Sequence, residues 1–451
     1  MTIPLVTCAR LSVISKVDAR FSNHSGSLEK GQKMNTTPLN KENLESIVRG
    51  ACLLSSGGGG TYTSGMNLLK NFVKSDYYPN GTVAMVSVEN IPDSTKDCGV
   101  VIAYMGAPQA IADLPYPAAG VAAAEKVKSW LEAQGKRLAY VVPVEIGALS
   151  SIVACTVAAK LGVPVVDGDG AGRAVPELTM LTFASEGISP NPTILSNEDG
   201  LAFTLKVDDP TGKENPDALI ELVARPVISL PIFNQQAGLA IWVMSVAEIK
   251  QAVKIRKTLS ACQAIGEQIK RFQEQWEPKA VDRLMFLINN YLNTKSFVLC
   301  KGTLAAAQNL TSGGFDHGVV SIKDDKGSIF TILFQNESLL AWDNQCTDVQ
   351  ALAPDSIAYI LEQDKQIVYS NGDLMENDAL RKDLIGRTVS VIGIAAQKEL
   401  REHENMRLQQ RLTLGIQNIN KNEIMKSFQD LLKQFGYYGP YVPIENIPRF
   451  N

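Results

Sequence analysis

The chain has 451 residues, of which 45% are hydrophobic and 20% charged, a composition typical of globular domains with well-formed cores. The formal net charge is only −4 and no segment is densely basic, so the sequence argues against nucleic-acid binding. No apolar run approaches the roughly 20 residues of a membrane-spanning helix, which argues against a membrane protein. The seven cysteines are scattered without a CxxC pair, which predicts reduced thiols in a cytoplasmic protein.

The first 33 residues have a different character from the rest. Charged residues such as Arg10 and Lys16 interrupt the apolar positions, so the segment does not match a secretory signal. We expect residues 1–33 to be either a disordered extension or the product of a start codon assigned too early.

Alternating helical and strand patterns follow in residues 34–230. Helices are predicted at 42–54, 64–74, 118–134 and 149–162, and buried strands at 82–88, 98–105, 137–145 and 163–167. This alternation predicts an N-terminal α/β domain with a largely parallel sheet.

The pattern changes after residue 230. Two strands within 228–244 and one long amphipathic helix at 246–276 are expected in a connecting segment, 231–295. Residues 296–395 contain short strands with turn signals, such as DDKG at 324–327 and the polar break QNES, and predict a β-rich C-terminal domain. Residues 396–451 are charged and predicted to be helical.

Three short loops follow the predicted strands, at 104–108, 143–147 and 167–173. In a parallel sheet, ligands bind beyond the carboxyl ends of the strands. The candidate binding and catalytic residues in and beside these loops are Met105, Gly106, Glu145, Asp167, Asp169, Arg173 and Glu177. The alternative for each of them is structural, because Asp and Gly also form turns and Glu177 matches an ordinary first-turn helix residue.

Four consecutive glycines, Gly57, Gly58, Gly59 and Gly60, separate the first two predicted helices and precede Thr61. The run is not a phosphate-binding P-loop, because it lacks the Gly-Lys-Ser/Thr ending. Its N–H groups lead into a helix N-terminus, so with Thr61 they are candidates to bind a substrate carboxylate or ring oxygen. The alternative is close helix packing or a flexible joint.

Only three histidines are present: His24, His317 and His403. This scarcity excludes a zinc centre built on several histidines and a Ser-His-Asp triad in the first domain. His317 lies in a Gly-rich stretch predicted to be a loop and is a candidate substrate-binding residue or proton shuttle. The alternative is an exposed histidine without a role.

An ordered set of motifs spread over residues 40–445 resembles one known family. The motifs are GACLLSSGGGG, YMGAP, PVEIG, AAKLGVPVVDGDGAGRAVPELTM, TSGGF, FQNESLLA and GYYGPYVPIENI. Together they resemble the S-methyl thiohydantoin desulfurase-like family, which is associated with hydantoinases. The resemblance implies an α/β domain followed by a β-rich domain. It also implies hydrolysis of a small cyclic amide, in which water replaces a methylthio group and leaves a hydantoin and methanethiol.

Such a reaction needs a base for the water and an acid for the ring nitrogen or the leaving group. Position and residue type favour Glu145 and Asp169 as the acid/base pair, Asp167 as their support and Arg173 as a clamp for an anionic ligand. No cofactor is predicted. An alternative is a divalent metal such as magnesium or manganese, held by Glu145, Asp167 and Asp169.

Two non-catalytic hypotheses stay open. In the first, the protein is an accessory subunit of a hydantoinase or oxoprolinase-type complex, with the helix at 246–276 as its contact face. In the second, it is a small-molecule binding protein without turnover. The charged C-terminal helix is a further candidate for contacts within a homo-oligomer.

Overall fold

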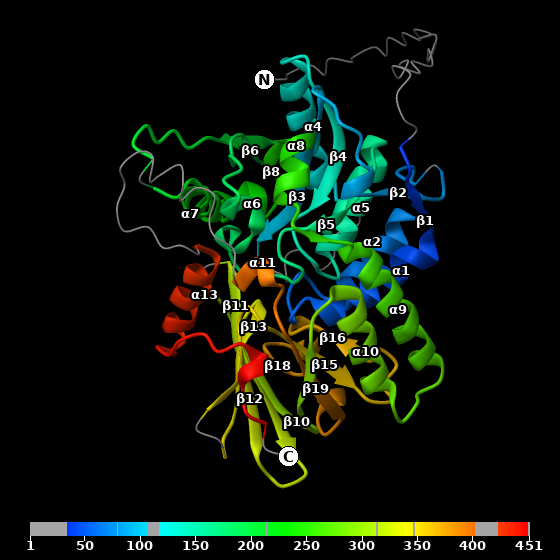
Figure 1. Ribbon diagram of the computed structural model, residues 1–451, viewed down its shortest axis with the longest axis vertical. Coiled ribbons are helices and arrows are strands. Elements are labelled where there is room, and N and C mark those ends of the chain that lie inside the picture. Colours follow the sequence, from blue (N-terminus) through cyan, green and yellow to red (C-terminus); the bar gives the residue numbers. More distant parts are fainter. Residues whose placement is uncertain are drawn as a thin grey trace, which may run out of the picture. The chain divides into compact units, whose positions relative to one another are not determined.

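The computed structural model describes residues 34–78, 80–106, 117–212, 214–312, 314–345, 348–401 and 423–449. Met34–Asn451 form one unit of contacting elements, and the prediction for residues 1–33 lies outside the described residues. Figure 1 colours this unit from blue to red along the chain. Within the described residues, no helix combines the length and the apolar character needed to cross a membrane.

The first part of the chain forms a mixed sheet with the strand order β1-β2-β5-β4-β3-β8-β6-β7. Its parallel centre consists of β2 (Val83–Ser87), β5 (Val165–Asp169), β4 (Arg137–Pro143) and β3 (Asp97–Gly106). The strands that pair antiparallel around it are β1 (Thr37–Leu39), β8 (Gln236–Ser245), β6 (Thr193–Ser196), β7 (Ala202–Leu205) and β9 (Ile255–Arg256). The prediction of an α/β domain with a largely parallel sheet is confirmed.

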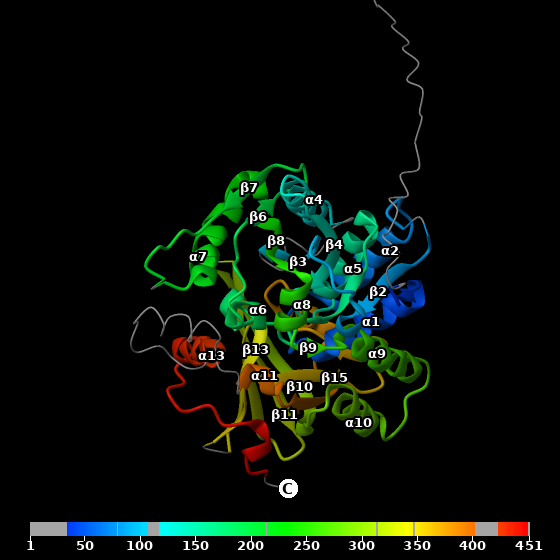
Figure 2. The ribbon, with the colours of Figure 1, turned by 45° about the horizontal axis from the view of Figure 1, so that its top comes forward.

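Helices cover both faces of this sheet because its central strands are apolar on both sides. Along β3, Val100 and Ile102 enter one hydrophobic core, whereas Val101, Ala103 and Met105 enter the other. The first core is covered by α1 (Lys41–Leu54), α2 (Tyr62–Phe72), α4 (Ala118–Glu132), α5 (Ser150–Leu161), α9 (Thr258–Glu274) and α10 (Ala280–Leu292). The second is covered by α6 (Thr182–Ser185), α7 (Pro216–Ile228), α8 (Val246–Ala252), α11 (Lys398–Arg401) and α13 (Glu423–Gln434). Figure 2 shows α5 and α8 on opposite sides of the central strands.

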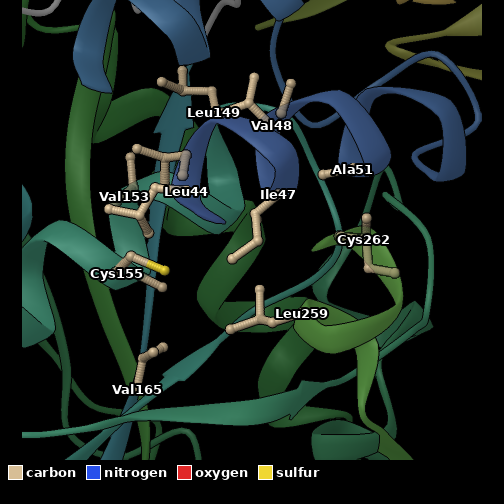
Figure 3. Packing of buried hydrophobic residues seen from close by; sticks show 14 of the residues in the cluster. Leu44, Ile47, Val48, Ala51, Leu149, Val153, Cys155, Val165, Leu259 and Cys262 are labelled. Atoms are coloured by element: carbon tan, nitrogen blue, oxygen red, sulfur yellow. The ribbon is translucent and has the colours of Figure 1, made fainter. Parts of the chain in front are cut away.

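Helix α1 lies at the centre of the first core. Asn40 and Asn43 form a reciprocal capping box at its start, with both N–H···O distances at 2.9 Å. The side chains that α1 sends toward α5 and α9 follow the helical repeat and are Leu44, Ile47, Val48 and Ala51 (Figure 3). The crossing with α9 is so close that a Cβ on Gly50 would lie 1.9 Å from Cys262 O, and one on Gly266 would lie 1.8 Å from Ser46 O.

Two element predictions are wrong. The sequence around 228–233 is no strand, because α7 continues to Ile228 and a 3₁₀ turn spans Pro231–Phe233. The single helix predicted at 246–276 is divided into α8 and α9 by β9, with Lys257 at φ 61°. The break has a packing cause: Ile249 enters the second core and Leu259 the first, so the chain must pass from one face of the sheet to the other.

The C-terminal part forms an antiparallel sheet with the strand order β14-β13-β12-β11-β10-β19-β15-β16. Its strands are β10 (Ser296–Ser312), β11 (Phe315–Asp324), β12 (Ile329–Gln335), β13 (Glu337–Asp343), β14 (Val349–Leu352), β15 (Ser356–Leu361), β16 (Val368–Tyr369) and β19 (Thr388–Ile394), with β17 (Met375–Glu376) and β18 (Ala379–Leu380) beside β10. The β-rich second domain is confirmed, as are the turns at 324–327 and at QNES. The predicted domain limits stay predictions, and β8, from the predicted connecting segment, lies in the mixed sheet.

Hydrogen bonds from the antiparallel sheet to the loop after α1, together with a shared hydrophobic core, join the two parts of the chain. Ser338 N–H donates to Ser56 O at 2.7 Å, and Ile357 N–H donates to Ser56 Oγ at 3.0 Å. Ala358 and Ile360 of β15 belong to the same hydrophobic core as α1. The carboxyl end of the parallel sheet is therefore held in place against the antiparallel sheet.

The α1–α9 crossing gives a stability prediction. Gly266→Ala should lower the free energy of unfolding by about 1–3 kcal/mol, because the added methyl group meets backbone atoms that cannot rotate away. Denaturant unfolding followed by circular dichroism measures the change. The exposed α9 variant Lys270→Ala is the control, and an unchanged midpoint for Gly266→Ala would show that the two helices separate freely.

Candidate functional site

A cavity of about 150 Å³ lies between the carboxyl ends of the parallel strands and the antiparallel sheet. From the N-terminal α/β domain, its lining includes Gly57, Gly58, Gly59, Gly60, Thr61, Met105, Gly106, Glu145, Ser150 and Glu177. From the antiparallel sheet and its loops it includes Asn309, Asp316, Asn336, Glu337 and Asn371. Two of the three predicted loops, 104–108 and 143–147, thus contribute residues to the cavity. The third, 167–173, does not, and the chain that follows it lines the cavity with residues 175–178.

Each glycine of the run is required by a close neighbour. Gly57, Gly59 and Gly60 have φ values of 83°, 64° and 85°, where side chains are disfavoured. A Cβ on Gly59 would lie 2.5 Å from Gly147 Cα, and one on Gly58 would lie 2.0 Å from Glu337 Oε1. The bare backbone therefore admits a carboxylate from the antiparallel sheet, and the run combines a packing role with a place in the cavity wall.

The start of α2, which follows the glycines, already has an anionic partner within the protein. Tyr62 N–H donates to Asp373 Oδ2 at 2.8 Å and Thr63 N–H donates to Asp373 Oδ1 at 3.3 Å. Thr61 caps the same helix by accepting a hydrogen bond from Ser64 N–H at 2.9 Å. The amides of Tyr62 and Thr63 are therefore occupied, so contacts of this loop with a ligand are left to the glycines and to Thr61.

Glu145 follows β4 and is held by two donors. Val175 N–H donates to its Oε2 at 2.8 Å, and Ser150 Oγ donates to its Oε1 at 3.2 Å. Burial, reinforced by the negative charge of Glu337, raises the pKa of Glu145 well above its usual range. The Glu145 carboxyl group therefore retains a proton at a pH where ordinary glutamates have lost theirs.

Glu337 is the second carboxylate of the cavity, and sequence reasoning missed it as a site residue. It is 3% exposed, and its Oε2 has no hydrogen-bond partner in the part of the chain that the structure describes. Burial raises its pKa to about 7, while the positive charge of Arg173 acts in the opposite direction. A buried, unsatisfied carboxylate oxygen is costly unless a ligand or water completes it.

A signal for Glu337 was present in the sequence. It lies in the QNES break between β12 and β13, where Asn336 adopts φ 53°. Asn336 N–H donates to Asp316 O at 2.7 Å, and Asn336 Oδ1 accepts from Asp316 N–H at 2.8 Å. The break therefore fixes three cavity residues, and the same stretch belongs to the motif FQNESLLA of the family resemblance.

Glu177 lies at the cavity wall near an ion pair. Glu221 pairs with Arg225 and also accepts a hydrogen bond from Leu178 N–H at 2.8 Å. Among the described residues, the Glu177 side chain accepts a long hydrogen bond of 3.4 Å from Thr179 Oγ1 and forms no ion pair. Burial, followed by the charge of Glu221, raises the pKa of Glu177 to about 7.

Arg173 does not line the cavity. Its guanidinium donates to Ala174 O at 2.8 Å, to Pro354 O at 2.7 Å and to Asp355 O at 3.0 Å, and it is 1% exposed. Burial lowers its pKa to about 10. This geometry corrects the expectation of an anion clamp: the planar fork is occupied by carbonyl oxygens and holds loops of the antiparallel sheet onto the first domain.

Asp167 and Asp169 also lie outside the cavity lining. Asp167 Oδ1 accepts from Ser260 N–H at 3.1 Å in the first turn of α9. Asp169 Oδ1 accepts from Ala171 N–H at 2.7 Å and from Gly172 N–H at 2.6 Å, which closes the tight turn after β5. Burial raises the pKa of Asp167, and it raises that of Asp169 to about 6. Their placement supports the structural alternative over the predicted catalytic roles.

No group of three or more His, Cys, Asp or Glu side chains is arranged to hold a metal ion within the described residues. This finding includes Glu145, Asp167 and Asp169, the set considered for a divalent cation.

His317 is in strand β11 and not in a loop, and it does not line the cavity. Its ring lies 6.1 Å from the ring of Phe435, measured between centroids. Adjacent residues on a strand face opposite sides, so it is Asp316 that reaches the cavity. His24 and His403 lie outside the described residues.

Comparisons with known proteins agree with this architecture. Residues 42–207 match the family model "S-Me-THD-like, N-terminal domain", and residues 215–424 match "S-Me-THD-like, C-terminal domain". A crystal structure of a protein from Chromobacterium violaceum superposes with a TM-score of 0.78 and is 39% identical, covering 90% of this chain and 100% of that chain. Comparison of the sequence with functionally curated proteins found no match. The two family models and the matching fold show that this chain belongs to the S-Me-THD-like family.

Proposed function

We propose that the protein is a hydrolase that replaces the methylthio group of a small cyclic S-methyl thiohydantoin by water. The observation that carries the proposal is the pair of buried carboxyl groups, Glu145 and Glu337, in one cavity. Burial raises the pKa of both groups, but the negative charge of Glu337 adds to the shift at Glu145 whereas the positive charge of Arg173 opposes the shift at Glu337. These opposite influences favour Glu145 as the acid and Glu337 as the base. Family membership supports the substrate class.

In the first step, ionised Glu337 accepts a proton from water through its free Oε2. The water oxygen bonds to the ring carbon that carries sulfur, and the electrons of the C=N bond move to the ring nitrogen. Protonated Glu145 donates its proton to that nitrogen. The product of this step is a neutral tetrahedral adduct, formed without separating charge across a buried site.

In the second step, the adduct collapses to a carbonyl. The new hydroxyl group returns a proton to Glu145 while the carbon–sulfur bond breaks, and the departing sulfur takes the proton held by Glu337. Methanethiol and the hydantoin leave, and both carboxyl groups regain their starting protonation states. The reaction consumes one water molecule and requires no oxidant or reductant.

Glu337→Gln and Glu145→Gln should each lower kcat for methanethiol release by about 10²–10⁴-fold, because each removes one proton-transfer group. Free thiol is followed with a chromogenic reagent, and ring products by chromatography, over a panel of S-methyl thiohydantoins and cyclic ureas. Glu132→Gln, an exposed acid at the end of α4, is the matched control. If the unaltered protein releases no thiol from any compound, the proposed activity is wrong.

The rate should depend on pH in a defined direction. Because Glu337 must be ionised, kcat/KM should rise as pH increases through about 7, and because Glu145 must be protonated, it should fall again at higher pH. Glu337→Gln should lose the rising limb and retain the falling one. A rising limb that persists in this variant would assign the base to another group.

The same carboxyl group should reduce stability at neutral pH. The pKa of Glu337 rises from 4.5 to about 7 on burial, so the folded state binds more protons and loses stability as pH increases through this interval. Glu337→Gln should therefore unfold at a higher temperature than the unaltered protein at about pH 8, with a smaller difference at about pH 5. Differential scanning calorimetry measures both. An equal difference at both values would contradict the burial of this charge.

A further inference from the structure

The charged residues of the cavity are mostly acidic. Five carboxyl groups contribute to the described lining: Glu145, Glu177, Glu221, Asp316 and Glu337. Arg225 is the one basic residue in that lining. Glu145 is protonated and Glu221 pairs with Arg225, so the acidic character of the enclosure comes from the other three carboxyl groups; it favours cations over anions.

Arg225 is already engaged with the protein. It pairs with Glu221, and its guanidinium donates to Pro176 O at 3.2 Å and to Gly314 O at 3.4 Å. The guanidinium carbon also lies 3.6 Å from the centre of the Phe315 ring. With Arg173 engaged by carbonyl oxygens behind the wall, the described lining presents no uncommitted cation to a substrate carboxylate.

Glu177 lies in a wall that the cavity shares with a second, larger groove. This groove of about 640 Å³ adjoins the cavity, and the residues that line both are Glu177, Glu221 and Arg225. Glu221 is neutralised by its ion pair with Arg225, whereas Glu177 forms no ion pair within the described chain. The wall between cavity and groove thus carries two carboxyl groups and one guanidinium, and among the described residues Glu177 is the carboxyl group with which that guanidinium forms no ion pair.

An independent feature shows that the cavity is built for a ligand that donates hydrogen bonds. Glu337, almost fully buried in the wall, leaves Oε2 without a partner. The attacking water can satisfy that oxygen, and a ring substituent directed toward Glu177 then meets the wall that the cavity shares with the groove.

We propose that the preferred ligand is a five-membered cyclic amide whose ring substituent carries an ammonium, amidinium or guanidinium group, and that Glu177 is the specificity residue that pairs with this cation. The inference rests on the proposed function for the ring class. It adds the charge of the substituent, which the family membership leaves open.

Binding and turnover test this inference separately. Hydantoins with an aminobutyl, a butyl or a carboxyethyl substituent at the same ring carbon are titrated into the full chain by calorimetry at one pH and low salt. The aminobutyl compound should bind roughly tenfold or more tightly than the butyl compound, as expected for a charged hydrogen bond at a partly buried site, and the carboxyethyl compound most weakly. The corresponding S-methyl thiohydantoins then give kcat/KM.

Glu177→Gln should remove the difference between the aminobutyl and butyl compounds, and Glu177→Lys should favour the carboxyethyl compound. Glu132→Gln is the control and should keep the original order. Equal binding of the three compounds, failure of the aminobutyl compound to bind, or an order that is unchanged in both Glu177 variants would overturn the inference. If the compounds bind in the predicted order but release no thiol, only the proposed reaction is contradicted. If thiol is released without any preference for the charge of the substituent, only this specificity is contradicted.

Discussion

The contact between Glu337 and the glycine run is the interaction on which the site depends. The carboxylate comes from the antiparallel sheet and packs against the backbone of Gly58. A Cβ atom on Gly58 would lie only 2.0 Å from Glu337 Oε1. Desolvating this group costs free energy that the rest of the junction must offset. The fixed carbonyl contacts of Arg173 and the shared core of α1 and β15 provide that support, so the cavity exists because two sheets are held together around an unfavourable charge.

Much of the first domain could be predicted because its local signals agree with its packing. The helices at α1, α4 and α5 and the strands β3 and β4 each combine a clear apolar pattern with a length typical of the element. The division of 246–276 into α8 and α9 could not be predicted. The amphipathic pattern continues across Lys257, and only the passage between two cores, which is a tertiary constraint, interrupts the helix.

The site was predictable to the level of its loops and less so to the level of its residues. Glu145 and the glycines, which lie in the cavity wall, could be predicted because strand ends and helix junctions can be recognised in a sequence. Asp169 and Arg173 are residue types common in active sites, but their hydrogen bonds are made to backbone groups of the protein itself. Glu337 comes from a strand nearly 200 residues away from Glu145, and no local pattern indicates which strand of the second sheet faces the first.

The Asp373 carboxylate at the start of α2 has a consequence for how the protein is made. Asp373 follows Tyr62 by 311 residues, so the ribosome synthesises α2 long before it synthesises Asp373. Until Asp373 emerges, Tyr62 and Thr63 have their amides exposed and the glycine run has no wall to close against. The first half of the nascent chain therefore cannot complete the start of α2 or the cavity wall until the second half has been synthesised.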